Sequence, residues 1–255
     1  MIQAGALTAR GALPVELTHF VGREQELAAL RQLAGAARLL TLTGAGGSGK
    51  SRLALELVTH AGAADRELAW VELAPLMEER LVAGAVLRAL GSPTEGGVAT
   101  ADAIVSAVRE RPVTIVLDNC EHLVETCASL ADSVLRACPH LRIVATSREA
   151  LGVAGERAWL VPPMVLPRPD APVDGIAASD AVRLFLARAQ DVHPAFELTA
   201  SNACSVADIC IRLDGIPLAI ELAAARVRHL SPEQILDRLS DAFALLTTGA
   251  RTALP

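Results

Sequence analysis

The sequence contains almost no lysine and no run of basic residues. Of its 23 basic residues, 22 are arginines and one, Lys50, is a lysine, while the formal net charge is −6. Direct DNA or RNA binding requires clustered Lys and Arg that neutralise phosphates. We therefore expect this segment to make no direct contact with nucleic acid. Because arginine stands at every other basic position, the one position that keeps an ammonium group is informative.

Patterns for metal clusters, disulfide frameworks and membrane insertion are also lacking. The five cysteines form no CxxC pair, have no histidine at ligand spacing and are odd in number. They therefore predict small buried apolar residues of a reduced protein. The N-terminus shows no charged-then-apolar leader pattern, and every apolar stretch is interrupted before membrane-spanning length. These absences predict a soluble cytoplasmic protein without membrane contact.

Short β-rich runs alternate with helical patterns in the first 150 residues. The predicted strands are Leu39–Thr43, Leu68–Leu73, Val113–Asp118 and Leu141–Thr146. The predicted helices between them are Ser51–Ala61, Arg80–Leu90, Ala101–Glu110 and Leu123–Ala137, after an amphipathic helix within residues 22–35. This alternation predicts an α/β fold in which helices cover a parallel sheet.

Proline and helical periodicity divide the rest of the chain. Five prolines between positions 162 and 172 exclude a regular helix or a central strand there, and the pattern beyond them is purely helical, with helices expected from Pro217 and Ser231. We predict four parts: an extended arm over 1–18, a nucleotide-binding α/β domain over 19–161, a Pro-rich linker over 162–178 and a helical lid subdomain over 179–255.

A glycine-rich segment joins the first predicted strand to the helix after it. It satisfies the pattern G-x-x-x-x-G-K-[ST] of a P-loop NTPase, which predicts binding of ATP or ADP with Mg²⁺. Glycines let successive backbone N–H groups turn toward an anion, and the following helix points its positive end at the same place. The alternative is a glycine-rich turn that binds nothing. The residues predicted to bind the nucleotide here are Gly44, Ala45, Gly46, Gly47, Ser48, Gly49, Lys50, Ser51 and the adjoining Arg52.

Three residues receive specific roles at the phosphates. The compact ammonium of Lys50 fits inside a ring of amides, where a planar guanidinium is too broad, and is predicted to bridge the β and γ phosphates. The hydroxyl of Ser51 is predicted to coordinate Mg²⁺. Asp118 ends an apolar strand, the arrangement of a Walker B site, and is predicted to hold the metal shell from the other side. A strand-end Asp is also a common helix cap.

Hydrolysis further needs a group that orients or deprotonates water. Asn119 is a poor base, and the nearest acid is Glu121, which serves either catalysis or the N-terminus of the following helix. Arg148, just past the fourth predicted strand, lies at the same sheet edge and is predicted to contact the γ phosphate. Its structural alternative is an ion pair with Glu149 or Glu156.

Taken in order, these motifs resemble the NB-ARC (AP-ATPase) branch of the STAND signal-transduction ATPases over roughly residues 14–255. The resemblance is carried by FVGREQE at 20–26, the phosphate loop, VLDNCEH at 116–122, ATSRE at 145–149 and GIPLA at 215–219. The strings LPVELTHFVGRE, LGVAGE and LDGIPLAIELAAAR are more specifically similar to the ATPase module of actinobacterial LuxR-type and SARP-type transcriptional regulators.

The resemblance implies further roles. Val21, Gly22 and Arg23 would border the adenine, Pro217 would cover it, and Arg148 would act as the sensor arginine. It also implies a molecular switch, with ADP favouring a closed form, ATP favouring an open and self-associating form, and slow hydrolysis resetting it. Partners would be further copies or other signalling domains.

Two departures from the family pattern are visible. Asn119 occupies the second acidic position that many relatives show, which favours slow turnover. The family's winged-helix domain would begin just after Pro255, so the chain is expected to be a natural short form or a fragment. The alternative function is a nucleotide-stabilised binding scaffold without useful turnover.

Overall fold

The computed structural model describes residues 13–60, 66–92, 99–168 and 170–239. The chain divides into two compact units. An α/β unit comprises Met1–Phe20 and Glu24–Val161, and a helical unit comprises Val21–Arg23 and Pro162–Pro255. The helical unit therefore takes in three residues whose neighbours on both sides along the chain belong to the α/β unit.

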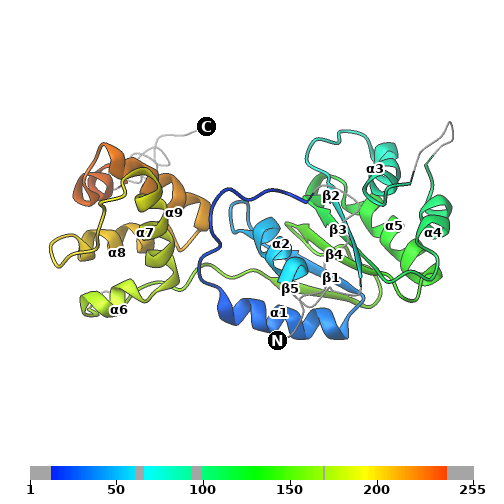
Figure 1. The fold of residues 1–255 in the computed structure, drawn as a ribbon, viewed down its shortest axis with the longest axis horizontal. Coiled ribbons are helices and arrows are strands. Elements are labelled where there is room, and N and C mark those ends of the chain that lie inside the picture. The colour runs from blue at the N-terminus through cyan, green and yellow to red at the C-terminus, as the bar shows by residue number, and fades with distance from the viewer. Residues whose placement is uncertain (1–12, 61–65, 93–98, 169, 240–255) are drawn as a thin grey trace, which may run out of the picture. The chain divides into compact units, whose positions relative to one another are not determined.

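Five strands and the helices between them form the α/β unit (Figure 1). The strands are β1 (Leu39–Thr43), β2 (Glu67–Glu72), β3 (Val113–Asp118), β4 (Arg142–Ser147) and β5 (Glu156–Leu160). The helical segments are α1 (Glu24–Ala36), α2 (Lys50–His60), η2 (Glu79–Leu81), α3 (Val82–Ala89), α4 (Ala101–Val108), η3 (Cys120–His122) and α5 (Val124–Ala137).

The sheet has the order β2-β3-β4-β1-β5, and every neighbouring pair is parallel. β4 lies between β1 and β3, with Thr43 paired to Ser147 and Leu117 paired to Ala145. Because the strands are parallel, the carboxyl ends of β1, β3 and β4 meet at one edge. Ligands bind at this edge in open α/β sheets.

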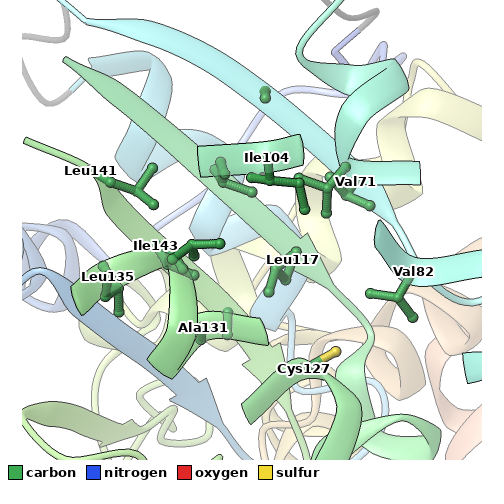
Figure 2. Packing of buried hydrophobic residues seen from close by; sticks show 14 of the residues in the cluster. Val71, Val82, Ile104, Leu117, Cys127, Ala131, Leu135, Leu141 and Ile143 are labelled. Carbon is green, nitrogen blue, oxygen red and sulfur yellow. The ribbon is translucent and has the colours of Figure 1, made fainter. Parts of the chain in front are cut away.

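Alternating side chains of each strand pack on opposite faces of the sheet. In β3, Ile115 and Leu117 join an apolar core with α3, α4 and α5, whereas Val116 joins a second core with α1 and α2. Figure 2 shows the first core, where Leu117 and Ile143 face side chains from α4 and α5. Burial on both faces explains why the central strands read as continuous apolar runs.

The helical unit packs around its own core, in which Phe185 is fully buried and its ring lies 6.1 Å from that of Phe196. Arg188 also lies inside this unit and pairs with Glu221 at 2.9 Å and with Asp191 at 3.3 Å. The elements are α6 (Val173–Ala177), α7 (Asp180–Val192), α8 (Ala203–Arg212), α9 (Pro217–Ala224) and η4 (Ala225–Arg228), followed by helical residues 232–239.

The parallel α/β fold with helices after it is confirmed, and the four predicted strands lie within one residue of the observed ones. Several boundaries were wrong. The region 80–90 starts as a 3-10 turn before α3, and α4 ends at Val108 because Arg109 leaves the helical region, with φ 46° and ψ −125°. α5 starts at Val124, after the separate turn η3. β5 was not predicted.

The predicted Pro-rich linker contains one short helix, and its role as a linker stays a prediction. α6 lies inside the predicted range 162–178, because Pro172 stands just before the helix, where its missing N–H costs nothing. Met164 is buried in the core of the helical unit, and its N–H bonds to the carbonyl of Gly215 at 2.9 Å. The four-part division otherwise stays a prediction, and residues 1–12, 61–65 and 240–255 lie outside the described residues.

Candidate functional site

The glycine-rich loop connects β1 to α2 and has the backbone geometry of an anion cradle. Gly44, Gly47 and Gly49 have φ values of 144°, 75° and 87°, which side-chain-bearing residues rarely adopt. The N–H of Leu53 donates to the carbonyl of Gly49 at 2.9 Å at the start of α2, and the first N–H groups of a helix have no acceptor within the helix. These donors, together with the positive end of the helix, suit a phosphate.

The lysine of the loop lies folded against the loop itself. Nζ of Lys50 donates to the carbonyls of Gly44 at 2.9 Å and Ala45 at 3.0 Å, and the residue is 6% exposed. Burial lowers the pKa of Lys50 below its usual value. The carboxylates of Glu121 and Asp118 oppose this shift, and the guanidinium of Arg148 adds to it. The four charged residues predicted from the sequence therefore share one electrostatic environment.

Asp118 is buried and held by a residue that the sequence reasoning missed. The hydroxyl of Thr146, on β4, donates to Oδ1 of Asp118 at 2.6 Å and accepts the N–H of Asn119 at 2.9 Å. Thr146 is fully buried. One threonine therefore orients the carboxylate and fixes the backbone after it. The parallel register of β3 and β4 brings these residues together, and the ATSRE string that contains Thr146 does not indicate this partner.

Asn119 follows Asp118 in a left-handed conformation, with φ 62° and ψ 57°. Asn tolerates this region better than most other residues with a side chain. A glutamate would adopt it at a greater cost, so the backbone at this position favours the amide that the sequence carries. The turn η3 then begins at Cys120 and carries Glu121.

Glu121 and Arg148 form an ion pair, with 3.5 Å between Oε1 and Nε. The alternative partner Glu156 is engaged elsewhere, because its carboxylate accepts the N–H groups of Leu151 and Gly152. Arg148 is largely exposed, at 69%, whereas Oε2 of Glu121 is buried without a hydrogen-bond partner among the described residues. Glu121 thus retains a free acceptor atom beside Lys50 and Asp118.

Arg52, directly after the loop, contacts the N-terminal arm. Its guanidinium donates to the hydroxyl of Thr18 at 2.9 Å and to the Thr18 carbonyl, and it lies 3.8 Å from Glu16. The end of the predicted arm is therefore held at the start of α2. The sequence alone indicated no role for this segment.

The residues assigned to the adenine belong to the helical unit. Val21 packs on the core of that unit, Gly22 and Arg23 are left-handed at φ 70° and 63°, and Pro217 is the first residue of α9. The residues predicted to bind the phosphates lie in the α/β unit. The assignment to the base stays a prediction.

The side chains present fit a magnesium ion with a nucleotide. Ser51 in the first turn of α2 and Asp118 supply the oxygen donors that Mg²⁺ prefers, and such sites take one or two protein ligands with phosphates and water. Within the described ranges, no group of three or more His, Cys, Asp or Glu side chains could hold a metal ion alone. In the same ranges, no helix has the length and apolar character needed to cross a membrane.

Comparison with known families agrees with this geometry. Residues 32–154 match the family described as AAA domain, and the glycine-rich loop, Asp118 and four of the five strands lie in this range. The α/β unit has the fold of a P-loop NTPase, and part of it is similar to the AAA domain.

Two relatives from Mycobacterium tuberculosis strain H37Rv match most of the chain. One, an uncharacterized protein, is 44% identical over 93% of this chain, which spans 58% of that relative. The other, named "Putative HTH-type transcriptional regulator Rv0890c", is 46% identical over 88% of this chain, which spans 24% of it. The chain therefore covers about half of the first relative and a quarter of the second.

Solved structures share the fold at low identity. A STAND protein with a tetratricopeptide repeat sensor from Pyrococcus horikoshii has a TM-score of 0.54 and 17% identity, covering 92% of this chain and 34% of that one. The Aeropyrum pernix ORC2 protein, solved as ADPNP-ADP complexes, has a TM-score of 0.56 and 14% sequence identity. The match covers 89% of this chain and 70% of that one. The ORC1 protein of that organism, solved with DNA, has a TM-score of 0.53 and 16% sequence identity. The match covers 88% of this chain and 66% of that one. These likenesses show the fold alone, so the expectation of no nucleic-acid contact stays untested.

Proposed function

We propose that the chain is an ATP- and ADP-binding regulatory switch module, with slow Mg²⁺-dependent hydrolysis, of a signalling protein of the transcriptional-regulator type. One observation carries the proposal: the buried ammonium of Lys50 lies in a glycine-rich loop and shares its surroundings with Asp118, Glu121 and Arg148. The AAA-domain match and the regulator name of one relative support it.

In this proposal each charged residue has one task. Lys50 exchanges its bonds to the loop carbonyls for bonds to the β and γ phosphates, which is favourable because charge-assisted bonds are stronger than those to neutral carbonyls. Asp118, oriented by Thr146, and Ser51 hold the Mg²⁺, which when bound neutralises phosphate charge. Glu121 orients the attacking water through its free Oε2.

Arg148 is proposed to report the γ phosphate. Because its side chain is 69% exposed and its bond to Glu121 is long, at 3.5 Å, it can leave the carboxylate for a phosphate with little loss. Loss of the γ phosphate would return Arg148 to Glu121. A switch that moves between 1:99 and 99:1 needs about 5.5 kcal/mol of differential binding, so contacts made only with the γ phosphate must supply much of it.

The alternative function is a nucleotide-stabilised scaffold without useful turnover. Two observations favour it: Asn119 is no base, and one oxygen of Glu121 is engaged by Arg148. Under this alternative Glu121 neutralises Arg148 and does no chemistry.

Measured phosphate release separates the two functions. Wild type and Asp118→Asn are assayed with Mg²⁺ and ATP, and ATP binding is measured in parallel by calorimetry. The switch requires slow release by wild type and its loss in Asp118→Asn. If both proteins bind ATP but neither releases phosphate, the switch proposal is wrong and the scaffold function is supported. Absence of ATP binding by wild type would contradict both.

A further inference from the structure

A crevice opens between the sheet and the helices α1 and α2, at the edge where the strands begin. Figure 1 shows these two helices on one face of the sheet. The volume of the crevice is about 100 Å³, and all of its described lining residues belong to the α/β unit. Because the strands are parallel, this edge lies opposite the one that carries the glycine-rich loop and Asp118. The crevice is therefore separate from the candidate nucleotide site.

Core side chains form much of the lining, so the inner part of the crevice is apolar. Apolar surface of this kind favours contact with an apolar group over contact with water. A cavity of about 150 Å³ holds benzene, so about 100 Å³ holds an apolar body of roughly four carbon atoms. The core residues in the lining come from β1, α2, β2 and β4 and are Leu40, Leu57, Val58, Leu68 and Val144.

Arg66, just before β2, lines the same crevice and bonds to neutral groups. Its Nε donates to the hydroxyl of Thr114 at 3.2 Å, and its Nη2 donates to the carbonyls of Val113, at 3.1 Å, and His140. Its Nη1 makes no hydrogen bond to any residue that the structure describes. Arginine stays protonated in proteins, so the guanidinium keeps its positive charge and an unused donor.

Arg142, the first residue of β4, adds a second positive charge to the lining. Its Nη2 donates to the carbonyl of Gly35 at 3.4 Å, and within the described ranges neither it nor Arg66 forms an ion pair. Glu67, the one carboxylate of the described lining, is engaged by Nη1 of Arg111 at 2.8 and 3.2 Å. Burial lowers the pKa of Arg66, and the neighbouring charge of Arg142 lowers it further. The two guanidiniums therefore repel each other, and an anion beside both would relieve that repulsion.

We propose that this crevice is a second ligand site, which binds a small aliphatic carboxylate. The carboxylate group bonds to Arg66 and Arg142, whose planar guanidiniums match its geometry. The hydrocarbon part, of roughly four carbons, contacts the apolar lining. A ligand with both parts uses the whole crevice, whereas an inorganic anion leaves the apolar lining in contact with water. The inference does not depend on the proposed function.

Binding of four small molecules to the full chain tests the proposal. Isovalerate has the required charge and hydrocarbon part, isovaleramide keeps the shape without the charge, acetate keeps the charge with a single methyl group, and inorganic phosphate has no apolar part. Ligand-observed NMR titration measures each affinity. We expect saturable binding of isovalerate and binding of the other three that is weaker by about tenfold or more. Mg-ATP should not displace isovalerate, because the phosphates bind at the opposite edge of the sheet.

Variants test the two halves of the lining separately. Arg142→Gln removes one guanidinium and should weaken isovalerate binding by about tenfold. Ala34→Leu, on α1, adds bulk to the lining without touching either arginine, and should also weaken isovalerate binding by about tenfold or more. Arg157→Gln changes an exposed arginine of β5 outside the crevice and is the matched control, with wild-type affinity expected.

Four results would overturn the inference. The first is the absence of saturable isovalerate binding by wild type, and the second is equal affinity in wild type and Arg142→Gln. Equal affinity for acetate and isovalerate would show general anion binding without use of the apolar lining. Displacement of isovalerate by Mg-ATP would place the carboxylate in the phosphate loop instead. Should Arg142→Gln fail to fold, isovaleramide on wild type and Ala34→Leu still decide the question.

Discussion

The phosphate loop and the Gly22–Arg23 turn both rely on left-handed residues but are held in opposite ways. The loop is held by its own members: Lys50 bonds to carbonyls five and six residues before it. The turn is held by Asp180, 157 residues away and in another element. The residues that hold the loop all lie within eight consecutive positions, so they form a motif that can be recognised in the sequence. For the turn, the local sequence shows only Gly22, because the supporting residue Asp180 lies far along the chain.

The largest effect is expected on turnover at the phosphate side. If Glu121 orients the water, Glu121→Gln should lower the rate of phosphate release by about 10²- to 10⁴-fold, the usual contribution of a general base, with ATP affinity nearly unchanged. Phosphate release under saturating Mg-ATP measures this. Glu125→Gln, an exposed change in the first turn of α5, is the matched control. Equal rates in wild type and Glu121→Gln would show that the Glu121 carboxylate takes no part in turnover.

Removing the ammonium group of Lys50 should weaken phosphate binding by the loop. Lys50→Ala loses charge-assisted contacts worth roughly 1.5–3 kcal/mol, about ten- to a hundredfold in affinity. The affinities for ATP and for inorganic tripolyphosphate should weaken together, because both ligands would lose the same phosphate contacts. Calorimetry with both ligands tests this, and Arg31→Ala, on the exposed surface of α1, controls for lost charge. Unchanged affinities would remove the central claim.

Two glycine substitutions sharpen the comparison through stability. Gly22→Ala meets both a left-handed backbone and the Asp180 side chain, and should destabilise the protein by about 1–3 kcal/mol. Gly46 has no positive φ, and a Cβ added to it would have nothing within 4 Å, so Gly46→Ala should change stability by less than about 1 kcal/mol. Denaturant unfolding without nucleotide measures both. Equal destabilisation would contradict the role given to Asp180.

The smallest effect concerns pH. The protonated Lys50 binds phosphate, so ATP affinity is present below the Lys50 pKa and is lost as pH rises through it. Burial already lowers this pKa and Glu121 raises it. Glu121→Gln should therefore move the alkaline loss of ATP affinity to lower pH. Affinity measured from about pH 7 to 10 tests the shift, with Glu125→Gln as control. A shift to higher pH would contradict the assignment.

The same contrast explains what the sequence could predict. The phosphate loop and the apolar strand that ends in Asp118 are local patterns, so the sequence predicts both. The central strands could be predicted because burial on both faces makes them continuous apolar runs. β5 was not predicted because it is a short edge strand whose residues are mostly exposed. Thr146 and Asp180 escaped because each acts through a hydrogen bond between distant parts of the chain. Neither side chain lies in a motif that names its partner.

The helical unit is discontinuous along the chain, because residues 21–23 belong to it although they precede the whole sheet. Genetic recombination near Val161 would join an α/β unit from one parent to a helical unit from another. The turn would then come from the first parent and the residue that supports it from the second. Positions 22, 23 and 180 must therefore be inherited as a compatible set. Chimeric relatives should tolerate such a crossover only when Gly22 meets an Asp or Asn at position 180.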